Sequence, residues 1–432
     1  MQNVKKLVRK IFPSSLAEGM ADIFRFFRGW FWQAYFGFPG KGQRIIAVTG
    51  TNGKTTTVSF INEMLKEAGL KTAILTTAYY EVDGKKEFNA THRTLGSQKD
   101  AQGFLAKAKK ANVDVIIMEI TSHALVQRRV KGLSFEGVLI TNLAKDHLDY
   151  HGTMDNYAAA KALAITDYNA QWVVLNSSDK WFEFFKGHVS KSQKLITFGE
   201  TEDSNIKLKS HSQKRDRVAV EILSYGKEQK FTIQLIGGFN ACNSVSAYAV
   251  GTALSIDPNS IAKGLGQLSG VDGRMEEIKE GQNFKVFVDY SYASDQLSSA
   301  IDASKEVANG SEVAVVFGAT GDRDQAHWRL MGEGSVGADK IYLTDDETYL
   351  NDPATIRATV MEGIKSKGTK AKVTEIADRK EAIRIAFKEA KAGEIVILAG
   401  LGHQDYRNMG GKKLVWKEAQ IARELLLQLH KA

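Results

Sequence analysis

The 432-residue chain has little cysteine and little proline. Its one cysteine, Cys242, excludes a disulfide within the chain and a zinc site built from several cysteines. Its four prolines give few breaks, so domain limits must come from the alternation of apolar and polar segments. No internal repeat and no low-complexity block is visible. With so little cysteine and no repeats, the simplest interpretation is an ordinary globular protein in a reducing compartment.

The N-terminal segment 1–43 lacks a continuous apolar stretch and a small-residue cleavage site, so we expect no secretory signal. It is basic and rich in aromatic residues instead. A basic, aromatic helix can lie on an anionic membrane surface, or it can pack on the protein or on a second subunit, and both interpretations stay open. The residues concerned are Lys5, Lys6, Arg9, Lys10, Phe24, Arg25, Phe26, Phe27, Arg28, Trp30, Phe31, Trp32, Tyr35, Phe36 and Phe38.

Length and charge allow a cytoplasmic chain of two or three domains. Hydrophobic residues make up 43% and charged residues 25%, which argues against disorder and against an integral membrane protein. The net charge of +8 suits polyanionic small molecules as well as nucleic acid, and the basic residues are spread out rather than gathered in one stripe.

Apolar segments of strand length alternate with helical segments along most of the chain. This pattern predicts an α/β fold: a central P-loop domain with a mostly parallel sheet over 44–270, then a Rossmann-like α/β domain over 271–432. A short antiparallel excursion is expected between them. Predicted strands are 45–48, 72–75, 113–118, 137–141, 172–175, 218–222, 231–235, 286–288, 312–317, 340–343, 372–375 and 395–398.

A phosphate-binding loop follows the first predicted strand, with the sequence Gly50-Thr51-Asn52-Gly53-Lys54-Thr55-Thr56-Thr57. A strand, a glycine loop and a helix form a cradle in which backbone N–H groups point at phosphate oxygens. Lys54 would reach the outer phosphates, and Thr55 would put its hydroxyl on Mg²⁺. Val48 stands where the usual eight-residue pattern has its first glycine, so the loop is a variant that still predicts nucleotide triphosphate binding.

Further polar groups follow later strands. Glu119 ends a buried strand, where ligands bind in a doubly wound sheet. With His147 it could hold a divalent ion, although magnesium sites do not require a histidine. His123, His151 and Tyr157 are as well explained by packing or structural hydrogen bonds.

Taken in order, these segments resemble the Mur ligase family, in particular the branch that adds the third residue to UDP-N-acetylmuramoyl-dipeptide. The resemblance covers about residues 45–428. It is carried by the loop 50–55, Glu119–Leu125, Gln127, Arg129-Val130, Gly132-Leu133, Thr141–Gly152, Tyr157, Lys161, Gly238-Phe239-Asn240, Asn243, Gly273-Arg274-Met275-Glu276, Val288-Asp289-Tyr290, Gly321-Asp322-Arg323-Asp324 and Gly402-His403.

The resemblance implies a cytoplasmic, ATP-dependent, ADP-forming amide ligase of peptidoglycan precursor synthesis, and so a role in cell shape and division. ATP would phosphorylate a carboxylate of a UDP-N-acetylmuramoyl-dipeptide, and an amino acid would attack the acyl phosphate. It implies small-molecule substrates and no nucleic acid. Two alternatives stay open: a related ligase acting on another γ-glutamyl or lipid-linked acceptor, and a non-catalytic nucleotide-binding scaffold of wall synthesis.

The resemblance also implies roles for individual residues. ATP and two Mg²⁺ ions are expected, with Thr55 and Glu119 on one ion, His147 joining Glu119 at the second, and Lys161 carbamylated to support the metals. Lys54 and Arg274 would neutralise the transferring phosphoryl group, with Asn142 near the phosphates. Asn240 and Asn243 would lie by the adenine and Asp289 by the ribose. Expected substrate contacts are Thr94, Ser97, Thr121, Ser122, His123, Gln127, Arg129, Arg323, Asp346, Glu347, Tyr349, Gly400 and Gln404.

Departures from the family pattern concentrate on the amino acid that is added. Members that add diaminopimelate carry Asp-Asn-Pro-Arg where this chain has Asp346-Glu347-Thr348-Tyr349. They also carry Gly-Lys-Gly-His-Glu where this chain has Gly400-Leu401-Gly402-His403-Gln404. The forked cation is lost, although Arg323 can still grip an α-carboxylate. We therefore expect a different or differently held amine, lysine or another diamine among the options.

Three further departures concern the nucleotides. The motif Asp-Tyr-Ala-His-Thr-Pro appears here as 289–294 without its histidine, and Asp272 replaces a proline. Family members also carry an N-terminal domain of roughly a hundred residues that holds the uridine nucleotide, and 43 residues are too few for it. The uridine nucleotide is then held by the central domain alone, or the donor is a different one, such as a membrane-anchored muropeptide.

Overall fold

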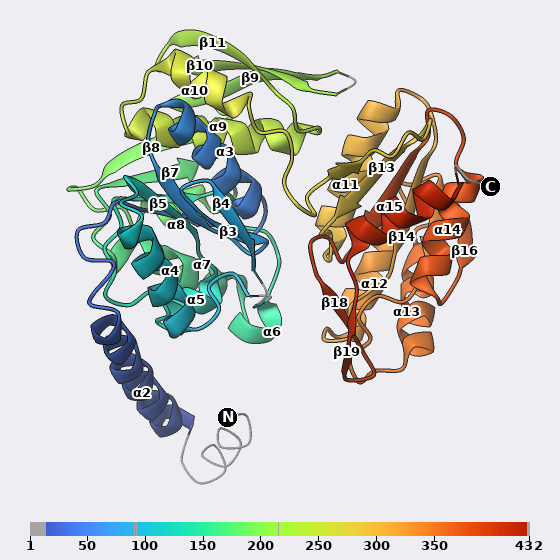
Figure 1. Cartoon of the computed structure of the whole chain (residues 1–432), viewed down its shortest axis with the longest axis horizontal. Helices are drawn as coiled ribbons and strands as arrows, with labels where there is room; N and C mark the ends of the chain where they lie inside the picture. The colour runs from blue at the N-terminus through green and yellow to red at the C-terminus, as the bar shows by residue number, and fades with distance from the viewer. Residues whose placement is uncertain (1–13, 90, 92, 215, 430–432) are drawn as a thin grey trace. The chain divides into compact units, whose positions relative to one another are not determined.

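The computed structural model describes residues 14–89, 91, 93–214 and 216–429, which form two compact units (Figure 1). Unit 1 comprises the chain up to Lys207 with Val245–Gly264, and unit 2 comprises Leu208–Ser244 and the chain from Leu265 on. The basic residues at 5, 6, 9 and 10 lie outside the described residues. Domain limits at 43 and 270 remain predictions. In the described part of the chain, no helix is long and apolar enough to cross a membrane.

Unit 1 is built on a mostly parallel sheet. From β8 to β2 every neighbouring pair is parallel, and β3 and β4 add an antiparallel edge. The order is β8-β7-β6-β1-β5-β2-β3-β4. The central strands are fully buried, as expected when helices cover both faces. The strands are β1 (Ile45–Thr49), β2 (Thr72–Leu75), β3 (Tyr79–Val82), β4 (Lys85–Phe88), β5 (Val115–Glu119), β6 (Gly137–Ile140), β7 (Trp172–Asn176) and β8 (Lys194–Gly199).

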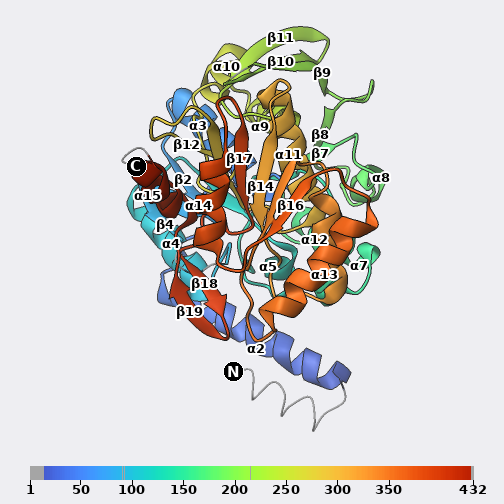
Figure 2. The ribbon, with the colours of Figure 1, turned by 90° about the vertical axis from the view of Figure 1, so that its right-hand side faces the viewer.

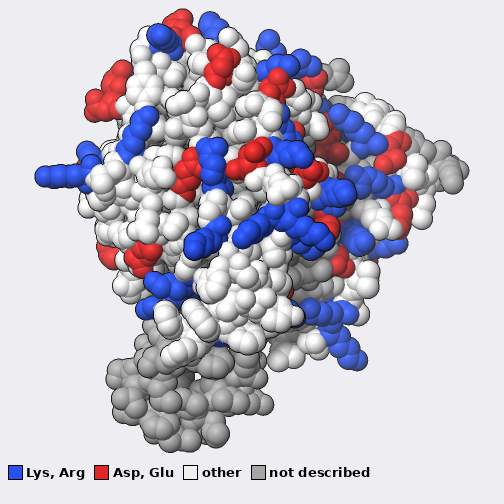
Figure 3. All heavy atoms as spheres, turned by 60° about the vertical axis from the view of Figure 1, so that its left-hand side comes forward, with Lys and Arg blue, Asp and Glu red and all other residues white. Residues whose placement is uncertain are grey.

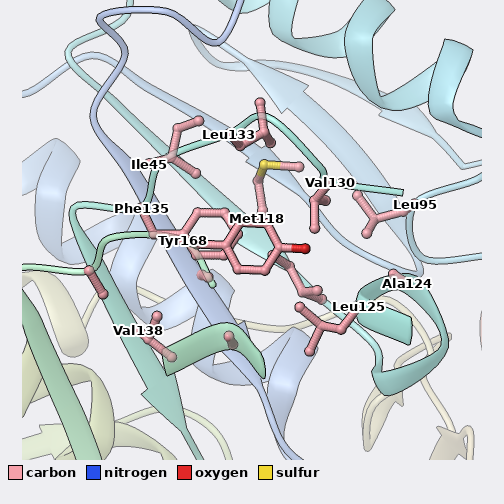
Figure 4. Packing of buried hydrophobic residues seen from close by; sticks show 14 of the residues in the cluster. Ile45, Leu95, Met118, Ala124, Leu125, Val130, Leu133, Phe135, Val138 and Tyr168 are labelled. Carbon is pink, nitrogen blue, oxygen red and sulfur yellow. The ribbon is translucent and has the colours of Figure 1, made fainter. Parts of the chain in front are cut away.

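Helices and loops complete the core of unit 1. Phe135 stacks on Tyr168 with ring centroids 4.6 Å apart, and Met118, Val130 and Leu133 lie around the pair (Figure 4). The helices are α2 (Ser14–Tyr35), α3 (Lys54–Glu67), α4 (Gln98–Lys110), α5 (Ser122–Val126), α6 (Leu148–His151), α7 (Met154–Thr166), α8 (Phe182–Lys186) and α10 (Pro258–Leu265), and α9 (Gly238–Ala253) runs from unit 2 into unit 1.

The expected antiparallel excursion is present as the hairpin of β10 (Val218–Ser224) and β11 (Lys227–Ile233). The polar segment before it also forms a strand, β9 (Ile206–Gln213), which the sequence pattern does not predict. Its first two residues pair in parallel with the end of β8. Lysines and serines hide this strand, because most of its side chains are exposed or half-buried.

Unit 2 contains a second sheet in the order β12-β13-β17-β14-β15-β16, parallel except for β12. Helices α11, α12 and α13 cover one face, and α14 and α15 cover the other (Figure 2). The elements are β12 (Glu276–Ile278), β13 (Lys285–Asp289), α11 (Ser294–Ala308), β14 (Val313–Phe317), α12 (Gln325–Gly334), β15 (Lys340–Leu343), α13 (Pro353–Ser366), β16 (Lys372–Glu375), α14 (Arg379–Glu389), β17 (Ile395–Ala399), the hairpin β18 (Tyr406–Met409) with β19 (Lys412–Val415), and α15 (Glu418–Leu429).

Candidate functional site

In unit 1 the predicted site residues gather at the carboxyl ends of three adjacent strands. The register pairs Val48 with Glu119 on one side of β1 and Thr49 with Ile140 on the other. Loops that leave these strand ends therefore start side by side. Ligands of open α/β sheets bind at this edge, where the strand order reverses.

The phosphate loop depends on two glycines. Gly50 has φ 143°, and a Cβ there would lie 1.9 Å from Thr141 Oγ1. Gly53 is left-handed with φ 79° and caps α3. Asn142 fixes the loop: its Oδ1 accepts from the Asn52 N–H at 2.9 Å, and its backbone carbonyl accepts from the Thr51 N–H at 2.9 Å. The predicted cradle at the N-terminus of a helix is therefore present.

Three side chains of the first turn of α3 were predicted to serve phosphate and metal. Lys54 Nζ donates to the Thr51 carbonyl at 2.6 Å, so the ammonium lies over its own loop. Thr55 Oγ1 donates to Glu119 Oε2 at 2.8 Å. Thr56 is buried next to it.

Glu119 is a buried carboxylate with three donors. Besides Thr55, it accepts from the Thr77 N–H at 3.0 Å and from Thr77 Oγ1 at 2.9 Å. Thr77 Oγ1 lies 2.7 Å from Thr94 Oγ1, which ties a predicted substrate residue to the same carboxylate. Thr77 is absent from the residues that the sequence pattern singles out. Its position just after β2, at the same sheet edge, is the signal that points to it.

Lys161 is fully buried on α7. Its Nζ donates to the Gly50 carbonyl at 2.7 Å and lies 4.6 Å from the Tyr157 ring centroid. Burial, reinforced by the nearby Lys54 ammonium, holds the pKa of Lys161 well below its ordinary value. The neutral amine is therefore favoured far more than in a solvated lysine.

Aromatic and imidazole rings from α5 and α6 pack together beside the loop. His147 has φ 52°, and its Nε2 lies 3.3 Å from Asp146 Oδ2. The His123 ring lies 4.8 Å from His147 and 4.1 Å from Tyr150. The structure thus brings together two predicted histidines and adds Asp146, a carboxylate that the site predicted from the sequence lacks.

The other predicted substrate residues of unit 1 have local partners. Ser122 Oγ lies 2.9 Å from His151 Nε2. Arg129 binds Gln127 Oε1 through Nε and Nη2, and burial lowers the pKa of Arg129. Thr121 caps α5, and Ser97 forms a capping box on α4. These two hydroxyls have a structural role whatever else they bind.

The donors at this edge fit magnesium. Among the described residues, no group of three His, Cys, Asp or Glu side chains could hold a metal. Magnesium needs fewer protein ligands, because it keeps waters and phosphate oxygens around one or two carboxylates. Glu119 and the Thr55 hydroxyl offer hard oxygen donors 2.8 Å apart next to the phosphate cradle.

In unit 2 the predicted residues also follow the carboxyl ends of parallel strands. Asp289 ends β13, Arg323 lies in the loop after β14, and Gly400 and Gln404 follow β17. Asp346, Glu347 and Tyr349 follow β15. The sheet topology thus gathers at one edge residues separated by more than a hundred positions.

Asp289 and Arg274 lie on neighbouring segments of this edge. Asp289 Oδ2 accepts from the Met275 N–H at 2.7 Å, and Ser291 donates to Oδ1. Burial raises the pKa of Asp289. The Arg274 guanidinium lies 4.8 Å from the Tyr290 ring centroid.

Asp346 belongs to a buried ionic cluster. Arg379 bonds Glu418 at 2.7 Å, and its Nη1 lies 3.8 Å from Asp346 Oδ2. Gly400 allows this approach, because a Cβ there would lie 2.3 Å from Asp346 Oδ2. Arg407 Nη2 donates to the Asp346 carbonyl at 2.9 Å. Burial raises the pKa of Asp346, and the nearby Arg379 charge opposes that rise. Its neighbour in the sequence has separate contacts.

Glu347 is that neighbour. Its Oε1 accepts from the Asn408 N–H at 2.9 Å, and Gln404 Nε2 lies 3.5 Å from Oε2. Burial, and next the Asp346 charge, raise the pKa of Glu347 to about 7. Among the described residues, Gln404 Oε1 and Asn408 Oδ1 are buried without a hydrogen-bond partner. Such acceptors next to a carboxyl suit a ligand that carries N–H donors.

The remaining predicted residues of unit 2 are bonded to other residues of the same unit. Tyr349 has φ 50°, and its N–H donates to the Asn408 carbonyl at 2.9 Å. The Arg323 N–H donates to the Thr320 carbonyl at 3.4 Å. In the first turns of α9, Asn243 Nδ2 donates to Asn240 Oδ1 at 3.1 Å.

Two family descriptions match the sequence. "Mur ligase middle domain" matches residues 48–251, and "Mur ligase, glutamate ligase domain" matches residues 273–402. The site residues of the unit 1 edge lie within the first range, and those of the unit 2 edge lie within the second except for Gln404, two residues beyond it.

Two of the proteins that the sequence resembles carry the same name. The chain is 35% identical over 398 residues to the "UDP-N-acetylmuramoyl-L-alanyl-D-glutamate--2,6-diaminopimelate ligase" of Syntrophomonas wolfei, covering 91% of this chain and 80% of that protein. The enzyme of the same name from Aquifex aeolicus is 35% identical over 393 residues, with 91% and 79% covered.

Solved structures show the same fold. A diaminopimelate ligase of that name aligns with TM-score 0.64 and 28% identity, covering 90% of this chain and 79% of the other. Folylpolyglutamate synthase of Mycobacterium tuberculosis, complexed with ADP and AMPPCP, aligns with TM-score 0.68, 16% identity and coverage of 85% and 91%. At that identity the second likeness concerns the fold alone.

Proposed function

The chain belongs to the Mur ligase family, and we propose that it is an ATP-dependent, ADP-forming amide ligase that joins an amino acid to a UDP-N-acetylmuramoyl-dipeptide-like carboxylate. Its similarity to 2,6-diaminopimelate ligases supports a role in peptidoglycan precursor synthesis. ATP is the second substrate and Mg²⁺ the cofactor.

One observation carries the proposal: the phosphate loop and the Glu119 carboxylate form one hydrogen-bonded unit through Thr55. Mg²⁺, when bound, neutralises charge on phosphate oxygens. Thr55 and Glu119 would hold it where the loop presents the outer phosphates. His147 and Asp146 supply further donors close by, so a second ion at this edge is part of the proposal.

The chain's residues then act on the substrates. A carboxylate oxygen of the donor attacks the γ-phosphorus, and the bond from that phosphorus to the ADP oxygen breaks. Lys54 and Arg274 neutralise the phosphoryl oxygens during this transfer. The amine next attacks the acyl carbon, the C–N bond forms, phosphate leaves and the amine loses a proton. Asn142 orients the loop, and Asn240, Asn243 and Asp289 are proposed to hold adenine and ribose.

Lys161 is proposed to act as a carbamate. Its lowered pKa provides the neutral amine that CO₂ requires. The nitrogen bonds to carbon, a proton is released, and the cation becomes a carboxylate. An anion at this position would attract a Mg²⁺ ion bound nearby, whereas a buried ammonium would repel it.

The amine is proposed to be a diamino acid without a distal carboxylate, such as lysine or ornithine. Glu347 can accept the distal ammonium, and Tyr349 stands where diaminopimelate enzymes are expected to carry an arginine. Arg323 would hold the α-carboxylate, and Gln404 would accept an N–H from the ligand. For the donor we propose Thr94, Ser97, Thr121, Ser122, His123, Gln127 and Arg129 as contacts.

The reaction is placed in the cytoplasm, where ATP is available. The protein would lie at the inner face of the membrane if lipid, rather than protein, covers the aromatic residues of α2.

Phosphate release tests this proposal. The full chain is incubated with ATP, Mg²⁺ and UDP-N-acetylmuramoyl-alanyl-glutamate, with lysine, ornithine, diaminopimelate or alanine as the amine. We expect release that requires both donor and amine, with lysine or ornithine ahead of diaminopimelate. Mass spectrometry of the product identifies the new amide.

The alternatives predict other results. Phosphate release with a lipid-linked or folate-type γ-glutamyl donor, and none with the UDP-linked donor, would show that the carboxylate substrate is not a UDP-linked muropeptide. ATP binding without release on any donor would make the chain a scaffold. A preference for diaminopimelate would contradict the assignment of Glu347 but leave the ligase intact.

A further inference from the structure

Helix α2 has two unlike faces. Its inner face packs on unit 1: Arg28 Nε donates to Gln98 Oε1 at 2.8 Å, and Gln33 Nε2 donates to the Lys131 carbonyl at 2.8 Å. Gly29 is buried against Gln98, where a Cβ would lie 2.9 Å from Nε2. Gln98 Nε2 in turn donates to the backbone carbonyls of Arg25 and Arg128, both at 3.1 Å. The helix is therefore fixed in its rotation about its own axis.

The opposite side is an outer aromatic face, made of Phe26, Phe27, Trp30, Phe31 and Tyr35. The exposed fractions of these residues range from 45% to 66%. Residues three and four positions apart are neighbours on a helix surface, which links Phe26 to Trp30, Trp30 to Phe27, Phe27 to Phe31 and Phe31 to Tyr35. The five rings therefore form one continuous surface. Apolar patches of this kind on a folded protein mark interaction sites.

Positive charge surrounds this face. Between Asp22 and Glu63 the sequence has no acidic residue, while Arg25, Arg28 and Lys41 lie in or just after the helix. The segments that contact α2 are also basic: α4 carries four lysines against one aspartate, and 128–133 carries three basic residues and no acid. Figure 3 shows an uncharged area bordered by lysine and arginine side chains.

We propose that the outer aromatic face of α2 docks on an anionic lipid surface. Tryptophan, tyrosine and phenylalanine favour the boundary between headgroups and acyl chains, and basic neighbours are attracted by anionic headgroups. A second copy of this chain fits less well, because in a two-fold interface the basic surroundings of the two faces would meet each other. Docking would bring a cytoplasmic ligase to the membrane, independently of its proposed reaction.

Vesicle flotation tests the proposal. The full chain is mixed with vesicles of phosphatidylcholine alone or of phosphatidylcholine with phosphatidylglycerol, in low and high salt. We expect flotation with the anionic vesicles that weakens with salt, because screening reduces the electrostatic part. The variant Phe27→Ser/Trp30→Ser/Phe31→Ser should lose at least about tenfold in partition coefficient.

A matched control removes exposed apolar side chains elsewhere. Tyr225→Ser/Val415→Ser/Leu427→Ser changes three residues that are also exposed, and its flotation should equal that of the wild type. Circular dichroism and thermal unfolding show that each variant is folded. Equal loss in both variants, no flotation of the wild type, or a dimer that only the α2 variant dissociates would overturn the lipid proposal, the last in favour of a second copy.

Discussion

The carboxyl edge of the sheet in unit 1 and the carboxyl edge in unit 2 differ in how completely their polar groups are paired. At the first, Glu119 has three donors and Lys161 has the Gly50 carbonyl, and the Thr49 hydroxyl is the one buried side-chain group at this edge without a partner among the described residues. At the second, Gln404 Oε1 and Asn408 Oδ1 are buried without partners among the described residues. The edge proposed to handle phosphate, the constant substrate, is thus organised by the chain itself, which favours electrostatic catalysis. The edge proposed for the variable amine keeps acceptors for its ligand.

Each edge also buries ionisable groups whose neutral form burial favours: Lys161 at the first, and Asp289, Asp346 and Glu347 at the second. Burial lowers the pKa of Lys161 and raises that of Glu347 to about 7. A reaction with CO₂ would replace the Lys161 amine by an anion for as long as the carbamate is present, whereas Glu347 needs only a cationic ligand to become charged. Burial therefore prepares Lys161 for a covalent change in unit 1, and it makes the charge of Glu347 depend on a ligand in unit 2.

Removing the loop ammonium should have the largest effect. Lys54→Ala should lower kcat by at least about a thousandfold, because no other group neutralises the outer phosphates from the loop. Lys66→Ala, at the far end of the same helix, removes salt bridges with Glu63 and Glu81 away from the loop; it should lower stability and keep near-wild-type turnover. Phosphate release measures both. Comparable losses in the two variants would show a defect of α3 rather than of phosphate handling.

The proposed carbamate gives the next effect. Lys161→Ala should lower kcat by about a hundredfold or more, since a metal-supporting anion is lost. Acetate should partly restore activity by placing a carboxylate in the space left behind, and it should leave the wild type unchanged. If neither a crystal structure of the wild type nor NMR with labelled bicarbonate shows CO₂ bound to Lys161, and acetate gives no rescue, Lys161 acts as a neutral lysine instead.

Glu347→Gln should act on the amine and spare ATP. We expect the KM for lysine to rise about tenfold to a hundredfold, since a charge-assisted hydrogen bond is lost, with little change in the KM for ATP. In the wild type the KM for the amine should fall as pH rises through about 7, where the carboxyl ionises. The variant should lose this dependence. Glu375→Gln, which removes a partner of Arg357 in an exposed pair, is the control.

The smallest effect concerns stability. The pKa of Glu347 is raised from 4.5 to about 7 in the folded chain, so its contribution is complete below pH 4.5 and is lost as pH rises through about 7. Glu347→Gln should therefore flatten the decline in thermal stability of the ligand-free protein between these values. A decline as steep as in the wild type would assign it to other buried carboxyls, such as Asp289.

The sequence predicts best what is buried on both faces. Strands β2 and β15 have the predicted bounds, and the other central strands differ by one to a few residues. Strand β16, at the edge of its sheet and with exposed and half-buried side chains, also has its predicted bounds. Strand β4, Lys85–Phe88, is fully exposed and has no apolar alternation, so only its pairing with β3 makes it a strand. The hairpin β18–β19 is missed for the same reason, because β19 is exposed throughout.

For the site, motifs locate both edges but not the bonds within them. The pattern around Glu119 identifies the carboxylate, yet its pairing with Thr77 depends on β2 and β5 being neighbours. Likewise, the sequence shows that Glu347 departs from the family pattern, but it does not show that the Asn408 N–H, 61 positions away, donates to this carboxyl. Long-range pairing of this kind is set by topology, which local sequence does not encode.

Gln98 joins the N-terminal helix to the proposed donor site. Its single side chain is bonded to Arg28, to the Arg25 carbonyl and to the Arg128 carbonyl, and Arg128 precedes Arg129, which grips Gln127. Gln33 adds a second link, because its side chain donates to the Lys131 carbonyl at 2.8 Å. Two amide side chains thus tie α2 to the segment expected to meet the muropeptide, so a helix docked on lipid would hold that segment close to the surface, and Gln33→Leu/Gln98→Leu is the change that would loosen it.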